Sequence, residues 1–438
     1  MLQDRVLTGA MTLSYYQATR PEPPVRHAPL QGPHDIRVCV IGGGFAGLNT
    51  ALGLVERGMR DVMLLEGQQI GFGASGRNGG FVFGGFSLGE ASLLARLGAP
   101  RAKALYGGTM QAMELIRQRI HRHEIDCDAV EAGVIWANWF RDPSILRQRQ
   151  RLLAESFGVD WQWLPQSELR NLVHSQRYGD GLFEAGAFHF HPLKYALGLA
   201  RAATEAGLAV HECSPVVSLQ RNGSGWRITT PEGQVDAEQV VLACGGYLAG
   251  LDHRVDASVM PIATYVMTTE PLGSRMDDIL HTRAAVYDSR FAFDYYRPLP
   301  DTRLLWGGRI SIRDRSPEAV KRLLYRDVLK VFPQLDGVAV DHAWSGLMSY
   351  ARHQMPQIGL VGDGLWLAQA FGGHGVAPTT FAGELVASAI AQGDVRWREF
   401  NGFGLVSAWK PAGQVAAQLS YWWAGLKDGW KAAMEGSR

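Results

Sequence analysis

Three glycines and one acid near the start of this 438-residue chain have the types and spacing that nucleotide chemistry needs. Gly42, Gly44 and Gly47 follow an apolar run over residues 36–41, and Glu66 ends the next apolar run. In a Gly-x-Gly-x-x-Gly turn the first glycine permits the tight turn, the second lets a pyrophosphate approach the backbone, and the third lets a helix pack on the strand. An acid about 20 residues further on accepts hydrogen bonds from the adenosine ribose and favours a ribose without a 2′-phosphate. The pattern predicts binding of FAD or NAD rather than NADP.

The segment after Glu66 separates these two cofactors. Residues 70–80 are dense in glycine and also contain Ser75, Arg77 and Asn78. An NAD-binding domain would continue into its next helix, whereas backbone amides, a hydroxyl and a cation suit a phosphate or a flavin ring. An ordinary flexible loop is the alternative, and the adjacent nucleotide-binding pattern disfavours it. We therefore expect FAD.

The elements that must position these residues predict an α/β fold whose nucleotide domain is discontinuous. Residues 48–55 have helical spacing, and the strand predicted over 239–244 ends in small residues that allow a nucleotide close to the backbone. A strand over 365–370 leads into a second glycine-rich turn over 371–377, followed by a helix. The chain therefore leaves the nucleotide domain, builds another domain and returns.

We predict a discontinuous Rossmann FAD domain and a mixed α+β substrate domain with an antiparallel sheet. Side chains alternate between the two faces of the strand predicted over 291–297. One face carries Phe291, Phe293 and Tyr295, and the other carries Asp294 and Tyr296. The expected segments are 30–95, 193–258 and 345–400 for the FAD domain, 96–192 and 259–344 for the substrate domain, 1–29 for a surface arm and 401–438 for a helical tail.

Composition excludes several classes of protein. Lys and Arg number 43 against 42 Asp and Glu, whereas a nucleic-acid binder would show a basic surplus. No run of about 18 apolar residues predicts a membrane span, and the first residues lack the pattern of a signal peptide. The four cysteines have no metal-ligand spacing. We expect a cytoplasmic protein without a metal.

Taken together, these motifs resemble the D-amino-acid-oxidase-like FAD oxidoreductases over nearly the whole chain, most closely the branch with gamma-glutamylputrescine oxidase and L-pipecolate oxidase. The resemblance implies that the Rossmann FAD domain is of the glutathione-reductase type. The string over 74–80, Ala-Ser-Gly-Arg-Asn-Gly-Gly, is the most specific element of the resemblance. The other segments that carry it are Tyr15-Tyr16, 42–47, His191-Pro192, 243–247, Gly307-Gly308 and 372–375.

The resemblance implies a role for each glycine-rich segment. The first turn would hold the pyrophosphate at a helix N-terminus, Val216 would meet adenine through its backbone, and 373–376 would offer amides to the flavin. The implied FAD-binding residues are Gly42, Gly44, Phe45, Ala46, Gly47, Glu66, Gly73, Ala74, Ser75, Arg77, Asn78, Gly79, Gly80, Val216, Ala243, Gly245, Gly372, Gly373, His374, Gly375 and Val376.

Two departures from the family pattern are informative. Gly346 stands where sarcosine oxidases carry the cysteine that bonds to the flavin, so we expect a non-covalent FAD. Ala377 stands where those enzymes use a lysine to clamp a substrate carboxylate. An amine substrate, or a carboxylate held elsewhere, is therefore favoured over a small amino acid held as in sarcosine oxidase.

The implied reaction is hydride removal from the carbon beside an amine nitrogen, with oxygen or a respiratory carrier as the final electron acceptor. Four residues are catalytic candidates. His374 could touch the flavin or substrate, or make a structural hydrogen bond. Tyr296 and Arg297 could line the pocket, with Arg297 binding a carboxylate, or Arg297 could face water. Arg352 lies near the flavin-side segment, or in a solvated loop.

The aromatic segment over 419–431 is amphipathic. It could contact the inner face of a membrane, or dock on the body of the protein, which its few basic residues favour. Other functions remain open from the sequence: a D-amino-acid or sarcosine-type dehydrogenase, an NAD-dependent dehydrogenase, and a flavin-binding or tRNA-modifying protein that shares only the fold.

Overall fold

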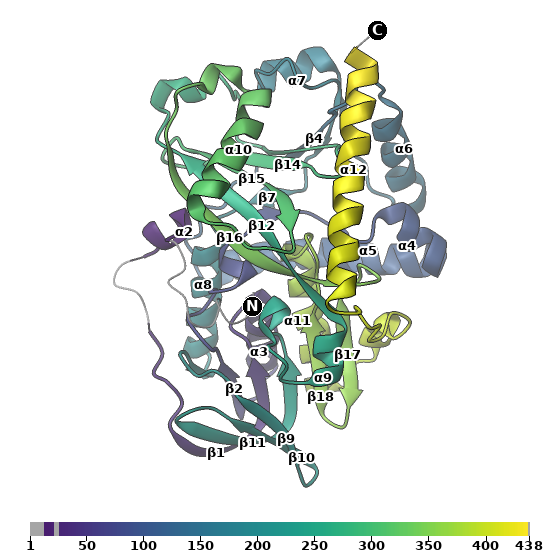
Figure 1. Cartoon of the computed structure of the whole chain (residues 1–438). Coiled ribbons are helices and arrows are strands. Elements are labelled where there is room, and N and C mark those ends of the chain that lie inside the picture. The colour runs from purple at the N-terminus through teal and green to yellow at the C-terminus, as the bar shows by residue number, and fades with distance from the viewer. Residues whose placement is uncertain (1–12, 22–25, 437–438) are drawn as a thin grey trace.

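The computed structural model describes residues 13–21 and 26–436. Figure 1 shows one large sheet in the lower half of the view and a second in the upper half, with the C-terminal helix running beside the upper one. Two eight-stranded sheets and one two-stranded sheet contain the named strands.

The first sheet is the predicted nucleotide-binding sheet. Its central strand, β1 (Gly32–Ile41), pairs in parallel with β2 and β11, and β8 and β18 extend the parallel part. Val38 and Val40 belong to one core cluster with Leu48 and Leu52, and Cys39 and Ile41 belong to another with Trp226 and Ile228. The strand is therefore buried on both faces. The other strands are β2 (Val62–Leu65), β8 (Ala209–His211), β9 (Ser218–Asn222), β10 (Gly225–Thr229), β11 (Gly233–Leu242), β17 (Gln357–Gly362) and β18 (Leu365–Gln369).

Helix α3 (Phe45–Glu56) follows the first glycine turn and is buried along nearly its whole length. It packs between α8 (Pro192–Glu205) and α11 (Val376–Gln392), and α11 also contacts α5 (Ala99–Arg122). The approach of α11 to α3 is close, because a Cβ added at Gly383 would lie 2.6 Å from the Cβ of Asn49. The two glycine turns, far apart in the chain, are thereby brought together.

The second sheet has the order β16-β12-β15-β14-β13-β4-β6-β5, and its pairs are antiparallel except β13 with β4. Helix α10 (Pro317–Val331) packs against β12, β15 and β16. The strands are β4 (Val134–Ala137), β5 (Gln162–Leu164), β6 (Gly181–Glu184), β12 (Val259–Thr269), β13 (Ala285–Asp288), β14 (Asp294–Pro298), β15 (Leu304–Ser311) and β16 (Val340–Ala351). The predicted fold class, a Rossmann domain with an antiparallel substrate sheet, is confirmed; the domain boundaries stay a prediction.

The remaining elements are short, apart from the last helix. The small sheet pairs β3 (Phe81–Val82) with β7 (Phe188–His189). The helices are α2 (Tyr15–Ala18), α4 (Glu90–Leu97), α6 (Ser144–Leu152), α7 (Gln166–Leu172), α9 (His253–Ala257) and α12 (Ala412–Gly436).

Two local expectations need correction. Strand β14 begins at Asp294, not at 291, because Arg290 bonds back to Asp288 in a turn; Phe291 is 60% exposed. Only Asp294 and Tyr296 therefore share a strand face as predicted. The arm also differs: Tyr15 and Tyr16 are buried in α2 rather than lying on the surface. Residues 1–12 and 22–25 of that arm lie outside the described residues.

Helix α12 is docked on the body along one face. The hydroxyl of Tyr421 accepts from the amide of Ile310 at 3.3 Å, and Asp428 accepts from the amide of Phe291 at 2.9 Å. The opposite face is exposed, and residues 437–438 lie outside the described residues. None of the helices in residues 13–21 and 26–436 has the length and apolar character of a membrane span.

Candidate active site

One cavity of about 1530 Å³ extends between the two sheets and is closed on one side by α12. Its lining comes from the first glycine turn, the loop after β2, the second sheet and the turn before α11. A typical small-molecule pocket measures roughly 300–1,000 Å³. The cavity therefore has room for a dinucleotide and a second molecule.

The first glycine turn closes one end of this cavity. Gly42 has φ +115°, which other residues rarely adopt, and a Cβ there would lie 2.6 Å from the carbonyl oxygen of Ala243. A Cβ at Gly44 would lie 2.9 Å from Ser75 Oγ, and one at Gly47 would overlap the Gly42 carbonyl oxygen. The ends of β1 and β11 and the loop after β2 thus meet around a backbone surface that only glycine permits.

Glu66 lies beside this turn and lines the cavity. Its two carboxylate oxygens accept hydrogen bonds from the amides of Gly43 at 2.7 Å and Gln68 at 2.8 Å. Burial raises the pKa of the Glu66 carboxyl, and these amides partly oppose the shift. Each oxygen keeps a lone pair, so the side chain can also accept from ribose hydroxyls.

The glycine-rich loop between β2 and β3 presents one buried cation with free donors. Arg77 is 4% exposed, lines the cavity, and has Nε and Nη1 atoms without a partner among the described residues. Burial also lowers its pKa. A buried guanidinium with unpaired N–H groups fits an anionic or carbonyl-bearing ligand, such as the phosphates or the ring of FAD.

Asn78, in the same loop, makes hydrogen bonds within the loop, and its expected approach to FAD stays a prediction. Its amide nitrogen donates to the carbonyls of Ala74 at 3.0 Å and Ser75 at 2.8 Å, and its oxygen accepts from the amide of Gly80 at 2.7 Å. These bonds shape the loop, although Asn78 still lines the cavity.

The second glycine turn approaches the cavity from the other side. Gly372 has φ +65°, and a Cβ at Gly373 would lie 2.7 Å from the hydroxyl of Tyr350. His374 Nε2 lies 2.7 Å from the Gly84 carbonyl oxygen, and its ring meets Phe83 edge-on at 4.2 Å. Burial lowers the pKa of His374 to about 4, so the neutral imidazole donates to Gly84. His374 therefore makes a structural hydrogen bond, which was one of its two expected roles. Its ring also lines the cavity.

Most of the predicted FAD-binding residues surround this single cavity; Gly47 and Gly80 do not line it. Gly47 instead packs α3 against its own turn, and Gly80 has φ +81° with Phe190 in the place a side chain would take. Those that line the cavity are Gly42, Gly44, Phe45, Ala46, Glu66, Gly73, Ala74, Ser75, Arg77, Asn78, Gly79, Val216, Ala243, Gly245, Gly372, Gly373, His374, Gly375 and Val376.

Two of the catalytic candidates are not in the cavity, contrary to expectation. Tyr296 is fully buried and stacks on Trp306 at 4.7 Å, in the core between the second sheet and α10. Arg297 is 1% exposed and donates to the carbonyls of Gly79 at 2.7 Å and Phe190 at 2.9 Å. It can bind no substrate carboxylate there. Arg352 lines the rim and is exposed, with its guanidinium 4.1 Å from the ring centroid of Trp409.

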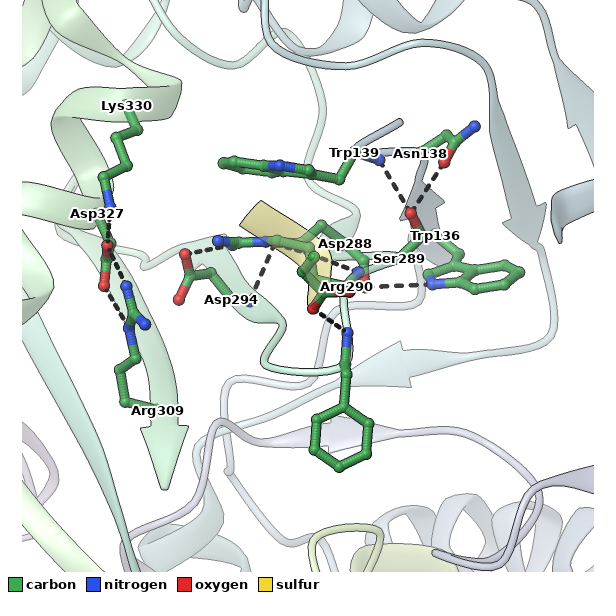
Figure 2. Close-up of polar contacts among 12 residues, drawn as sticks. Trp136, Asn138, Trp139, Asp288, Ser289, Arg290, Asp294, Arg309, Asp327 and Lys330 are labelled. Carbon is green, nitrogen blue, oxygen red and sulfur yellow. Dashed lines mark hydrogen bonds and ion pairs between the residues drawn. The ribbon is translucent and has the colours of Figure 1, made fainter. Parts of the chain in front are cut away.

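Carboxylates neutralise the arginines along the wall formed by β13, β14 and β15. Figure 2 shows Arg290 between Asp288 and Asp294, close to the ring of Trp139. Its Nη2 lies 2.6 Å from an oxygen of each acid. Burial raises the pKa of Asp294 to about 7 against the attraction of Arg290. Arg309 holds both oxygens of Asp327, at 2.8 and 2.7 Å, so neither arginine is a free cation.

Sequence reasoning missed the polar group at another part of the cavity. Glu90, the first residue of α4, accepts a 2.7 Å hydrogen bond from Arg149 of α6, and both line the cavity. Trp136 and Tyr287 form the adjacent wall. Arg149 lies in the run Arg-Gln-Arg-Gln-Arg, which is typical of a solvated helix, so no signal in the sequence marked it.

Comparison with known proteins agrees with this geometry. The model of the DAO family, described as FAD dependent oxidoreductase, matches residues 37–389. The gamma-glutamylputrescine oxidoreductase of Escherichia coli (strain K12) is 34% identical over 86% of this chain and 89% of its own length. The probable oxidoreductase OrdL of Haemophilus influenzae is 32% identical over 93% and 94%. The crystal structure of glycine oxidase from Geobacillus kaustophilus has a TM-score of 0.72 at 23% identity, covering 85% of this chain and 99% of that one, and shares the fold.

Proposed function

Because the chain belongs to the DAO family of FAD dependent oxidoreductases, we propose that it oxidises the carbon–nitrogen bond of an amine, with no carboxylate on the reacting carbon. The observation that carries this proposal is the first turn of α11. Ala377, where a carboxylate clamp would stand, is 1% exposed and apolar, and the arginines of the facing wall are paired. The name of the E. coli relative, which specifies gamma-glutamylputrescine, supports an amine.

The substrate bonds change in a balanced way. The C–H bond beside nitrogen breaks, its electron pair leaves as hydride, and nitrogen loses a proton, which leaves an imine. Water then adds and gives a carbonyl compound and ammonia or a shorter amine. FAD, when bound, supplies the hydride acceptor.

The chain's own contribution is a dry, aromatic enclosure. Phe81, Phe83, Tyr287 and Tyr295 line the cavity, and their rings contact one another: Phe81 with Tyr295 at 5.4 Å and Phe83 with Tyr287 at 5.7 Å. An apolar surrounding disfavours the charged ammonium and so favours the unprotonated amine that hydride removal requires. No strong base is needed for this step.

The residues present fit a non-covalent FAD. Gly346 lines the cavity and offers no nucleophile. The one cysteine among the described residues that line it, Cys244, holds the Ile41 carbonyl oxygen at 3.4 Å, and burial raises the pKa of its thiol to about 12. A protonated thiol of this kind does not attack a flavin.

Anaerobic mixing of the purified flavoprotein with a substrate panel tests the proposal. The panel contains acylated diamines, pipecolate, proline, sarcosine, and D- and L-amino acids. Bleaching of the flavin absorbance by the amines is expected; bleaching only by D-amino acids or sarcosine would establish that alternative instead, and no bleaching by any compound would refute catalysis. Repeating the reactive mixture in air separates an oxidase from a dehydrogenase that uses a respiratory carrier.

We also propose that the exposed face of α12 rests on an anionic lipid surface at the cytoplasmic side of a membrane. Its exposed residues form one stripe: Val415, Leu419, Trp422, Trp423, Leu426, Trp430 and Met434. The acids Asp428 and Glu435 bond to backbone amides of the body, and Lys431 Nζ lies 4.2 Å from the ring centroid of Phe140. Lys427 is exposed and is left to face a partner. Tryptophan and lysine together suit a lipid headgroup region.

Co-sedimentation with vesicles tests the lipid contact. Binding is expected to vesicles rich in phosphatidylglycerol, and replacing the three tryptophans of the stripe by serine should abolish it. Val395→Ser, at an exposed position away from α12, is the control. Equal recovery of the wild type and the triple variant in the supernatant would refute this proposal without affecting the proposed reaction.

A further inference from the structure

We infer that Arg149 and Glu90 form a subsite for a zwitterionic head group, with Arg149 binding its carboxylate and Glu90 its ammonium. This inference rests on the proposed amine oxidation and specifies the other end of the substrate, away from the reacting bond. The first turn of α11 offers no charged group to a carboxylate. We assign that role to Arg149 of α6, beside Glu90 of α4.

Arg149 is held in a way that leaves donors free. Its guanidinium carbon lies 4.6 Å from the ring centroid of Trp136 and 4.7 Å from that of Trp161. These contacts use the flat faces of the guanidinium, so its N–H edges remain available for hydrogen bonds. The side chain is 22% exposed and lines the cavity.

The hydrogen bonds of Arg149 fall short of what a buried guanidinium requires. One nitrogen, Nη2, donates to Glu90 at 2.7 Å. Nη1 reaches the Tyr287 hydroxyl only at 3.4 Å, and Nε has no partner among the described residues. An unpaired buried donor costs about 1–3 kcal/mol, and a ligand carboxylate matches the guanidinium fork.

By contrast, the other two arginines along the substrate wall each bind carboxylate oxygens through both Nε and Nη2. Arg290 is bound by Asp288 and Asp294, and Arg309 by both oxygens of Asp327. An incoming carboxylate would have to displace a protein carboxylate from either of them. Arg149, with one acid and several donors, needs no such exchange.

Glu90 provides the matching negative charge. Its side chain is 12% exposed at the cavity, and only Oε1 takes the bond from Arg149. Burial would raise its pKa, but Arg149 outweighs this and holds the pKa below the usual range. Glu90 is therefore ionised at neutral pH and can accept from an ammonium group.

The charge balance of the cluster selects a zwitterion over a single charge. Glu184 lies within electrostatic reach of both residues, and its Oε1 is buried without a partner. Burial raises its pKa to about 8, so it is mostly neutral at pH 7. Glu90 and Arg149 then sum to zero. A lone ammonium or carboxylate would leave an uncompensated charge in a low-dielectric site, whereas a head group with both charges leaves none.

Four amides of butane-1,4-diamine test the inference with the intact flavoprotein. Their acyl groups are γ-glutamyl with both charges, glutaryl with a carboxylate only, 4-aminobutanoyl with an ammonium only, and butanoyl with none. For the wild type we expect the lowest KM with the γ-glutamyl amide. Arg149→Met should raise that KM about 10- to 100-fold and remove the advantage that the carboxylate confers. Glu90→Gln should remove the advantage that the ammonium confers.

A binding measurement complements the kinetics. The γ-glutamyl amide of butylamine has the same head group and no oxidisable amine at its end. It should raise the thermal midpoint of the wild type but not of Arg149→Met. Arg149→Lys, which keeps the charge but not the fork, should recover part of the effect. Arg151→Met, at an exposed position of the same helix that does not line the cavity, is the matched control and should leave all four KM values unchanged.

The outcomes separate this inference from the proposed function. If none of the four amides bleaches the flavin, the proposed amine oxidation fails. If all four react with equal KM in the wild type, the oxidation stands and the subsite is refuted. A KM that rises equally for all four amides in Arg149→Met, including the uncharged one, would assign Arg149 a purely structural role and also refute the subsite.

Discussion

Arg297 Nε donates a 2.7 Å hydrogen bond to the carbonyl oxygen of Gly79, and this bond ties the second sheet to the glycine-rich loop after β2. The same guanidinium donates to the Phe190 carbonyl at 2.9 Å and lies 3.3 Å from His189 Nδ1. Arg297, which the sequence suggested as a ligand-binding arginine, is therefore a buried structural residue that links the two halves of the cavity. Its replacement should disturb the cofactor loop rather than substrate recognition.

Replacing Arg297 by methionine should lower the free energy of unfolding by about 2–5 kcal/mol, because two buried carbonyls lose their donor. Flavin content should fall with it. Urea denaturation followed by tryptophan and flavin fluorescence measures both. Arg326→Met, on the exposed side of α10, is the control. If the Arg297→Met variant had wild-type stability and a raised KM, Arg297 would instead be a substrate-binding residue.

The stability of the protein should fall as the pH is lowered below 6.5. Burial lowers the pKa of His374 to about 4, and of His189 and His191 to about 3. Below pH 6.5 the unfolded chain binds protons at these imidazoles while the folded chain does not, so the free energy of unfolding decreases. The part due to His374 is lost between pH 6.5 and about 4, and amounts to about 3 kcal/mol. Urea midpoints of the wild type and His374→Gln over this range should converge as the pH falls; parallel curves would contradict the assignment.

Acid precipitation should release the flavin into the supernatant. Gly346 provides no thiol, and the thiol of Cys244 is protonated. After trichloroacetic acid treatment the pellet should be colourless and the supernatant should show free FAD by absorbance. A yellow pellet, or a band that fluoresces on a denaturing gel, would show a covalent bond.

A larger side chain on the face of α12 that lines the cavity should weaken substrate binding. Ala417 lines the cavity, whereas Val415, two residues earlier, is 50% exposed on the opposite face. Ala417→Phe should raise KM for an amine substrate at least several-fold, with flavin content unchanged, because it narrows the cavity beside the second sheet. Val415→Phe should leave KM as in the wild type. Equal kinetics for both variants would mean that substrate does not approach α12.

The cofactor half of the site was predictable because its determinants are local. Gly42, Gly44 and Gly47 must be glycine for the backbone to turn and approach its neighbours, and Glu66 follows at the end of the next strand. Such motifs have a fixed spacing in the chain, so they can be recognised without knowing what lies opposite them. The family resemblance, confirmed by the match over residues 37–389, extended this recognition to the turn before α11.

The substrate half depends on contacts between elements that are far apart in the chain. Arg149 lies in a polar run typical of a solvated helix, and Arg297 ends a predicted strand. Packing nevertheless places Arg149 at the cavity beside Glu90 and buries Arg297 beneath the loop at Gly79. The direction in which a strand or helix presents a side chain depends on which neighbour covers each face, and that is settled only when the sheets and helices assemble. The sequence alone therefore determined the fold class and the nucleotide motif. Only the tertiary structure decided which charged side chains meet the substrate, because burial and pairing are properties of the assembled chain.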